Sequence, residues 1–352
     1  MRSGPPLPKR PGRPGGVWSR SSWFRRGRRL ERDGGRRNVF RAIESECCAR
    51  PSIVGPPPDP AGSTAACTMP ELPEVEAIRR QLAASILGRS VERVRVHRRD
   101  VVRDLATRRL GRLSPGMLGA GQRVRRVDRR GKQLIVGFDG GHGLVVRLGM
   151  SGRIELVDAG RRRSVPPHRH VDWTIETGRG GSKLRMEFID PRRFGGVHLF
   201  QSPEDLEQRL LVNLGPEATT IDPKALAARL KAGRRPIKAA LLDQGMIAGI
   251  GNIYADEALF RAGIRPDRLV IDLDAGDLNR LAKSIRTTLA LAIKAGGTTL
   301  RDHRLPDGSP GTFGLVHLAY GRSGEPCRSC GAIMSSDLVA ARSTTWCDVC
   351  QA

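Results

Sequence analysis

Residues 236–261 read PIKAALLDQGMIAGIGNIYADEALFR and contain two helical patterns joined by a turn of small residues. Apolar residues recur at 237, 240, 241 and 242, and again at 253, 255, 258 and 259, so each pattern has one face to bury. Gly249 and Gly251 permit positive φ angles or close backbone approach, and Asn252 stands at an N-cap position. The stretch predicts two packed helices with a tight turn between them.

Two uses of this turn stay open. Backbone amides that are exposed at the start of a helix form a ready site for phosphate. An ordinary capped helix hairpin has the same spacing, and spacing alone favours that simpler interpretation.

The chain before Pro203 has a different periodicity from the chain after it. A helix is expected over 73–87, with Pro73 in its first turn and Gly88 at its end. Alternating or apolar runs then indicate eight short strands, as in a β-sandwich or a barrel. The expected strands are Ser90–His97, Gln122–Val127, Gln133–Phe138, Gly143–Leu148, Gly152–Leu156, His170–Ile175, Lys183–Ile189 and Val197–Phe200, and the later helices are 203–211, 223–232, 236–244, 252–261 and 273–295.

Four cysteines near the C-terminus form two C-x-x-C pairs. Sixteen residues separate Cys330 from Cys347, and those residues can supply two short strands. Zinc prefers four tetrahedral ligands, and each pair offers two thiolates. The spacing strongly indicates one structural zinc ion held by Cys327, Cys330, Cys347 and Cys350. A redox pair is the weaker alternative.

Composition points to a polyanionic partner. The chain carries 61 Lys and Arg against 36 Asp and Glu, a formal net charge of +25. Such a balance favours nucleic acid, although a GC-rich genome also enriches arginine. No stretch approaches the ~20 apolar residues of a membrane span. The metal-site pattern of the cysteines indicates a reducing compartment.

Residues 1–68 differ from the rest of the chain. They hold ten of the 24 prolines, and their 14 Lys and Arg face only five acids. Because they show no sustained apolar periodicity, disorder is expected. They lack the apolar core of a secretory signal, and their acids and prolines argue against a transit peptide.

Met69-Pro70-Glu71-Leu72-Pro73-Glu74-Val75-Glu76 places three carboxylates at a helix start, where the helix dipole favours them. If Met69 is an initiator that is removed, Pro70 presents a secondary amine. An α-amine has a pKa of roughly 7.7–8.0, so a neutral, nucleophilic fraction exists near pH ~7. Glu71 is placed to shuttle protons beside it.

This stretch resembles the start of formamidopyrimidine-DNA glycosylases. The resemblance extends to Gly251-Asn252-Ile253-Tyr254-Ala255, to Asp190-Pro191-Arg192-Arg193-Phe194-Gly195 and to the four-cysteine module, and it runs from Met69 to Cys350. The sister group, endonuclease VIII, usually begins Pro-Glu-Gly-Pro-Glu, so Leu72 favours the purine-specific branch.

The resemblance implies a mechanism. Pro70 attacks the sugar C1′ of the damaged nucleoside, and β,δ-elimination then cleaves the abasic site. Glu71 is the implied proton shuttle, and Lys132 is the implied catalytic lysine on a β-hairpin loop, although on its own it is a solvated turn residue. Arg342 is the fourth member of the implied catalytic set.

The resemblance also implies the DNA contacts. Side chains that enter the gap left by an extruded base offset the few kcal/mol that extrusion costs. Met150, Arg192 and Phe194 match the gap-filling positions, and Arg192 would face the orphaned cytosine. Core or surface roles are their plainer alternatives. The implied phosphate contacts are Lys132, His168, Asn252 and Arg342, with Arg342 on the zinc hairpin and His170 as an alternative surface residue to His168.

The expected fold is α+β, with an N-terminal β-sandwich domain behind a helix and a helical helix-two-turn-helix domain followed by a four-cysteine zinc-finger β-hairpin. The expected ligands are one Zn²⁺ and damaged double-stranded DNA, and a cytoplasmic, nucleoid-associated bacterial monomer is expected. The implied divisions are the extension 1–68, the catalytic domain 69–200, the helix-two-turn-helix domain 201–298, the lesion-recognition loop 299–313 and the zinc finger 314–352.

The extension is the one departure from the family pattern. A proline inside a chain has a tertiary amide nitrogen and no nucleophilic lone pair. Translation from Met69, processing that exposes Pro70, and a silent DNA-binding protein are therefore the alternatives, in that order. Two further alternatives for the function are an enzyme of the same fold that acts on oxidised pyrimidines and a ribosomal or transcription-associated zinc-ribbon protein.

Overall fold

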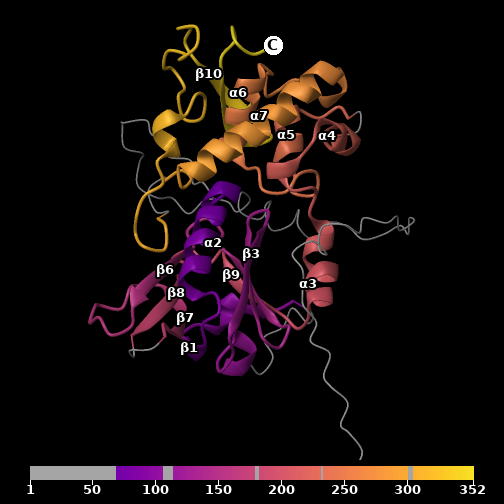
Figure 1. Ribbon diagram of the computed structural model, residues 1–352. Coiled ribbons are helices and arrows are strands. Elements are labelled where there is room, and N and C mark those ends of the chain that lie inside the picture. The colour runs from indigo at the N-terminus through magenta and orange to yellow at the C-terminus, as the bar shows by residue number, and fades with distance from the viewer. Residues whose placement is uncertain (1–68, 106–113, 179–181, 231–232, 300–303) are drawn as a thin grey trace, which may run out of the picture. The chain divides into compact units, whose positions relative to one another are not determined.

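The computed structural model describes residues 69–105, 114–178, 182–230, 233–299 and 304–352. All of them belong to one compact unit, 64–352. The predicted extension 1–68 lies outside the described residues. Figure 1 shows most strands in the indigo-to-magenta part of the chain, most helices in the orange part and a terminal strand in the yellow part.

Helix α2 (Leu72–Ile86) begins where the sequence predicted a helix start, with Pro73 in its first turn. Glu71 and Glu74 form a capping box, which satisfies amide donors that a helix start leaves unpaired. Ile78, Leu82 and Ile86 are fully buried on one face of the helix.

Nine strands follow and form two sheets. The four-stranded sheet has the order β1-β7-β8-β6, and the five-stranded sheet has the order β2-β9-β5-β4-β3. The strands are β1 (Val91–Val96), β2 (Val102–Asp104), β3 (Val124–Arg130), β4 (Gln133–Phe138), β5 (Gly143–Arg147), β6 (Arg153–Asp158), β7 (Arg169–Glu176), β8 (Lys183–Ile189) and β9 (Gly196–Phe200). The eight predicted strands are all present, and β2 is the one that was not predicted.

A single hydrophobic core joins α2 to both sheets. It contains Ile78 of α2, Trp173 of β7, Phe188 of β8 and Val146 of β5. Trp173 is buried and donates its indole N–H to the Leu118 carbonyl at 3.0 Å, so its polar atom is satisfied. The expected β-sandwich is confirmed.

The second half is helical and has its own core. Leu72, from the first turn of α2, belongs to this second core, so α2 contributes to both cores. The helices are α3 (Pro203–Arg209), α4 (Pro223–Leu230), α5 (Ile237–Leu242), α6 (Asn252–Ala262) and α7 (Ala275–Lys294). Short 3-10 turns lie at Arg99–Val101, Pro115–Leu118, Leu211–Asn213, Ala218–Thr220, Val270–Asp272 and Phe313–Val316.

The chain closes with the hairpin β10 (Ser335–Val339) and β11 (Arg342–Trp346). Ala340 and Ala341 both have positive φ, as a two-residue hairpin turn requires. The α+β prediction with a terminal cysteine hairpin is confirmed. Within the described ranges, no helix is long and apolar enough to cross a membrane.

Candidate functional site

Glu71 is buried against the turn that precedes α6. Its carboxylate accepts the amide of Gly251 at 2.6 Å and that of Ile253 at 2.9 Å. Next to it, the Leu72 amide donates to the Gly249 carbonyl at 3.1 Å. The chain segment that starts at Met69 is therefore fixed to the helix-two-turn-helix turn.

One detail of the predicted turn is wrong: Gly251, not Asn252, is the N-cap of α6. Of the two uses left open for the turn, the structure shows that the amides of Gly251 and Ile253 are occupied by the Glu71 carboxylate. Local spacing gave no signal of this, since the acceptor comes from 180 residues earlier.

Burial raises the pKa of Glu71 to about 7. The charge of Lys132 opposes this rise, and the charge of Glu74 adds to it. A carboxyl group with a pKa near neutrality can both donate and accept a proton at physiological pH. The proton-shuttle role of Glu71 stays a prediction.

Lys132 lies in the two-residue turn between β3 and β4, as the sequence predicted. The Glu217 side chain, from the helical half of the chain, binds this turn through hydrogen bonds and an ion pair. It accepts the guanidinium of Arg130 at 2.8 Å and the amide of Gly131 at 3.1 Å, and it pairs with Arg129. These contacts between the halves fix the lysine turn, and sequence reasoning missed Glu217.

Glu74 is a second buried carboxylate that sequence reasoning treated only as a helix-start acid. It accepts the Glu71 amide at 2.9 Å, the Thr298 amide at 2.7 Å and the hydroxyl of Tyr254. It therefore connects the start of α2 to α6 and to the segment leading into 299–313.

Part of the predicted lesion-recognition loop is described. Residues 300–303 lie outside the described residues. After them, Leu305 joins the sandwich core, Pro306 accepts the Leu156 amide at 2.8 Å, and Asp307 accepts the Gln81 side-chain amide at 3.0 Å. This part of the loop is held against the N-terminal half.

The predicted gap-filling residues come together on two loops. Gly149 and Gly195 bring these loops into backbone contact: a Cβ on Gly149 would lie 2.5 Å from the Gly195 nitrogen. Phe194 is 52% exposed, which excludes a core role. Arg192 is exposed, and Met150 is half-buried.

The two candidate histidines are distinguished by burial. His170 is buried and contacts the Asp190 carbonyl, whereas His168 is exposed with a positive φ. His168 is thus the histidine accessible to a ligand.

The zinc hairpin packs against α5 and α6. The Asn252 side chain donates to the Ser343 carbonyl at 3.0 Å, one residue after Arg342. Lys238 is fully buried, pairs with Asp256 at 2.6 Å and donates to Thr344 at 2.7 Å. These contacts place Asn252 and Arg342, two predicted phosphate ligands, on adjoining elements.

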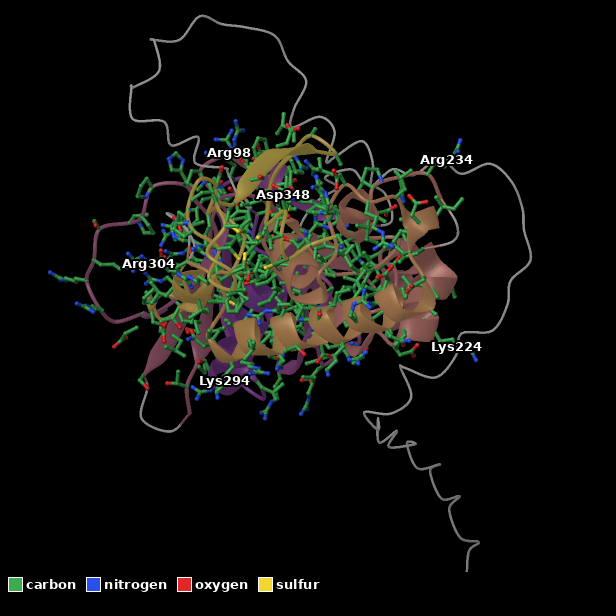
Figure 2. The ribbon with its side chains drawn as sticks, turned by 90° about the horizontal axis from the view of Figure 1, so that it is seen from above. Arg98, Lys224, Arg234, Lys294, Arg304 and Asp348 are labelled. Carbon is green, nitrogen blue, oxygen red and sulfur yellow. The ribbon has the colours of Figure 1, made fainter. Side chains whose placement is uncertain are left out.

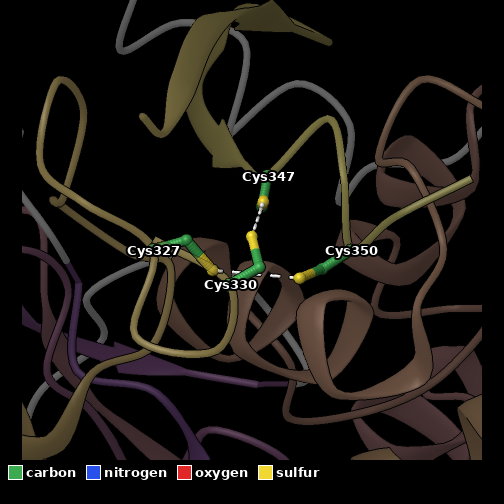
Figure 3. A group of neighbouring side chains, drawn as sticks. All are labelled: Cys327, Cys330, Cys347 and Cys350. Carbon is green, nitrogen blue, oxygen red and sulfur yellow. Dashed lines mark hydrogen bonds between the residues drawn. The ribbon is translucent and has the colours of Figure 1, made fainter. Parts of the chain in front are cut away.

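The four predicted metal ligands converge (Figure 3). Their Sγ atoms all lie within 4.8 Å of one another, with Cys327 and Cys350 at 3.9 Å and Cys330 and Cys347 at 3.5 Å. Tetrahedral zinc with Zn–S bonds of ~2.3 Å places its sulfurs about 3.8 Å apart. The residues fit one closed, structural zinc site.

Basic side chains project outward from several elements, as Figure 2 shows for Arg98, Lys224, Arg234, Lys294 and Arg304. Together with the net charge of +25, this distribution favours a polyanion. The fold and the site together define a class of protein, namely an enzyme that carries a zinc finger and acts on nucleic acid.

Comparison with known proteins identifies the family. Three family models match in order: the formamidopyrimidine-DNA glycosylase N-terminal domain at 69–197, its H2TH domain at 213–304, and the zinc finger found in FPG and IleRS at 324–352. The formamidopyrimidine-DNA glycosylase of Gluconobacter oxydans is 40% identical, over 80% of this chain and 100% of the relative. That of Thermus thermophilus is 42% identical, over 80% of this chain and 98% of the relative.

Comparison with solved structures supports the same family. The Thermus thermophilus structure has a TM-score of 0.68 at 39% identity and covers 80% of this chain and 98% of its own. The Lactococcus lactis structure with abasic-site DNA has a TM-score of 0.69 at 30% identity and covers 80% of this chain and 100% of its own. The chain belongs to the formamidopyrimidine-DNA glycosylase family. It is a DNA glycosylase/abasic-site lyase of base-excision repair with one structural zinc ion.

Proposed function

We propose that this enzyme removes 8-oxoguanine and formamidopyrimidines from double-stranded DNA and then cleaves the abasic site. The observation that carries the proposal is the buried Glu71 carboxylate, which directly follows Pro70 and is fixed to the turn before α6 by the Gly251 and Ile253 amides. The names of the relatives support the substrate class, and Lactococcus lactis structures hold abasic-site and Fapy-dG DNA.

The chemistry begins at Pro70. Its neutral nitrogen attacks C1′, the bond to the base breaks with its electron pair leaving on the base, and the base takes up the proton that the Pro70 nitrogen loses. Glu71 donates a proton to the ring oxygen, the C1′–O4′ bond opens, and an iminium joins C1′ to Pro70. Successive β- and δ-elimination expel the 3′ and 5′ phosphates, and water releases the enzyme.

This route requires a free amine at Pro70, so the active chain begins there. We infer translation from Met69 followed by methionine removal. The N-terminal family model begins its match at residue 69, and the Gluconobacter oxydans relative is covered completely by 80% of this chain. Solved relatives consist of this part alone, which supports independent folding of the chain from Met69.

The same proposal assigns the DNA contacts and the divisions of the chain. Met150, Arg192 and Phe194 fill the gap left by the extruded base, and the exposure of Phe194 and Arg192 supports this. Phosphates are bound by Lys132, His168, Asn252 and Arg342. The divisions remain 1–68, 69–200, 201–298, 299–313 and 314–352. The partner is damaged duplex DNA, bound by a monomer at the bacterial nucleoid in the cytoplasm.

Excision assays on matched duplexes test the substrate class. The enzyme is expected to release 8-oxoguanine opposite cytosine faster than thymine glycol. The reverse preference would favour oxidised pyrimidines, and a Lactococcus lactis structure does hold DNA with an oxidised pyrimidine. Binding without excision would indicate a silent DNA-binding protein.

A further inference from the structure

Asp190 is fully buried and connects the two loops that carry the proposed gap-filling side chains. One carboxylate oxygen accepts the Ser151 hydroxyl at 2.6 Å, and the other accepts the Gly195 amide at 2.7 Å. Ser151 directly follows Met150, and Gly195 directly follows Phe194. One carboxylate thus joins both loops.

The Ser151 hydroxyl extends the connection to Arg192. While it donates to Asp190, it accepts the Arg192 amide at 3.1 Å. The Arg192 backbone is therefore fixed through Ser151, one step from the carboxylate.

The backbone of Asp190 adds a third segment. Its amide donates to the His168 carbonyl at 3.1 Å, and its carbonyl accepts the His170 ring nitrogen at 2.7 Å. Every segment that bears a proposed gap-filling residue or His168 is thus bonded to Asp190.

The loops have no space to rearrange around this point. A Cβ atom built on Gly149 would lie 2.5 Å from the Gly195 nitrogen, and one built on Gly195 would lie 2.5 Å from the Arg147 carbonyl oxygen, closer than a methyl group tolerates. The ladder between β5 and β9 ends at Arg147 and Gly196, so beyond that pair the hydrogen bonds of Asp190 join one loop to the other.

We propose that Asp190, with Ser151 as its partner, is the positioning residue that aligns Met150, Arg192 and Phe194 as a unit to enter the DNA stack. This inference rests on the proposed function. Asp190 is fully buried, and its hydrogen bonds run to the segments that bear these side chains, so it acts on base extrusion and on recognition of the opposite base, and not on the chemistry of Pro70.

The central variant is Asp190→Asn in the chain that begins at Met69. An asparagine side chain of similar size has one acceptor oxygen and one NH₂ group, so it cannot accept from both Gly195 and the Ser151 hydroxyl. With its oxygen toward Gly195, its NH₂ group faces the Ser151 oxygen, and the Ser151 hydroxyl proton loses its acceptor. Ser151→Ala is the second variant, since it keeps the carboxylate and its bond to Gly195. Asp158→Asn is the matched control, because Asp158 is exposed and its carboxylate also accepts a backbone amide.

Each variant is measured on two substrates, with zinc content and Tm as folding controls. On duplexes with 8-oxoguanine opposite cytosine, both test variants are expected to lose on the order of 10- to 100-fold in single-turnover excision. Their preference for cytosine over adenine as the opposite base should fall with it. Borohydride trapping on a single-stranded abasic oligonucleotide, which needs no base extrusion, should match wild type and the Asp158→Asn control.

If the test variants lose duplex excision and abasic-site trapping to the same extent, Asp190 has only a general structural role. If duplex excision is undiminished, Asp190 does not position the gap-filling side chains. Both results would overturn the inference without bearing on Pro70 as the nucleophile of the wild-type chain. Absence of an adduct with the wild-type chain on either substrate would instead refute the proposed function itself.

Discussion

Replacement of Lys238 by methionine tests how the zinc hairpin is held to the helical half. The ammonium is fully buried between α5, α6 and β11, where it pairs with Asp256 and donates to the Ser343 carbonyl and the Thr344 hydroxyl. Methionine fills a similar volume but leaves the Asp256 carboxylate buried without its counter-ion. Among the residues that the structure describes, the Thr345 amide, at 3.2 Å, is then the one group that still donates to that carboxylate.

Removal of one partner from a buried ion pair costs about 3–5 kcal/mol of unfolding free energy. At roughly 2–4 °C per kcal/mol for a chain of this size class, Tm should fall by about 6–20 °C. The double variant Lys238→Met with Asp256→Asn removes both charges and keeps an acceptor for Thr345. It should therefore recover at least half of the loss.

Urea unfolding of zinc-loaded protein, followed by circular dichroism, measures both variants against wild type. A loss below about 1 kcal/mol for Lys238→Met would show that the buried pair is not stabilised as argued. A double variant no more stable than the single one would show that the unpaired Asp256 charge is not the cause.

Three further predictions follow from the site. In Glu71→Gln, single-turnover excision should fall by ~10²–10⁴-fold. Because burial raises the pKa of Glu71 to about 7, the wild-type pH profile should contain a limb near that value which the variant lacks; a limb that persists would assign it to another group. Cys347→Ser should lose bound zinc by atomic absorption and weaken duplex binding at least ~10-fold, because the hairpin that carries Arg342 loses a ligand; unchanged affinity would contradict the phosphate role of the hairpin. Gly149 has φ +63°, and a Cβ there would lie 2.5 Å from a facing backbone nitrogen, so Gly149→Ala should lower the free energy of unfolding by more than ~1 kcal/mol. The exposed control Gly160→Ala should not lower it. Equal Tm values for the two variants would argue against the close loop contact.

Local patterns predicted most of the fold. Pro73 and the apolar spacing after it located α2, and alternation located eight of the nine sandwich strands. β2 escaped prediction because it has only three residues and is an edge strand that pairs in parallel with β9, far along the chain. Two C-x-x-C pairs were sufficient for the metal site, since their ligands are close in sequence.

The contacts that assemble the site were harder to predict because they join distant segments. Glu71 and Gly251 lie 180 residues apart, and Gly131 and Glu217 lie 86 apart. Nothing near Asn252 indicated that a carboxylate from the start of α2 would occupy the amides at Gly251 and Ile253. Resemblance to a family supplied the site residues, whereas the carboxylates that hold them in place became visible only in the structure.

Borohydride trapping on an 8-oxoguanine:cytosine duplex, with the Met69-start chain beside the full-length chain, tests the central claim most directly. A covalent adduct from the short chain alone is expected, because only it exposes the Pro70 amine, and peptide mapping should locate the DNA on Pro70. A strong adduct from uncleaved full-length protein would contradict the account and would assign the chemistry to another amine, with Lys132 as the first suspect.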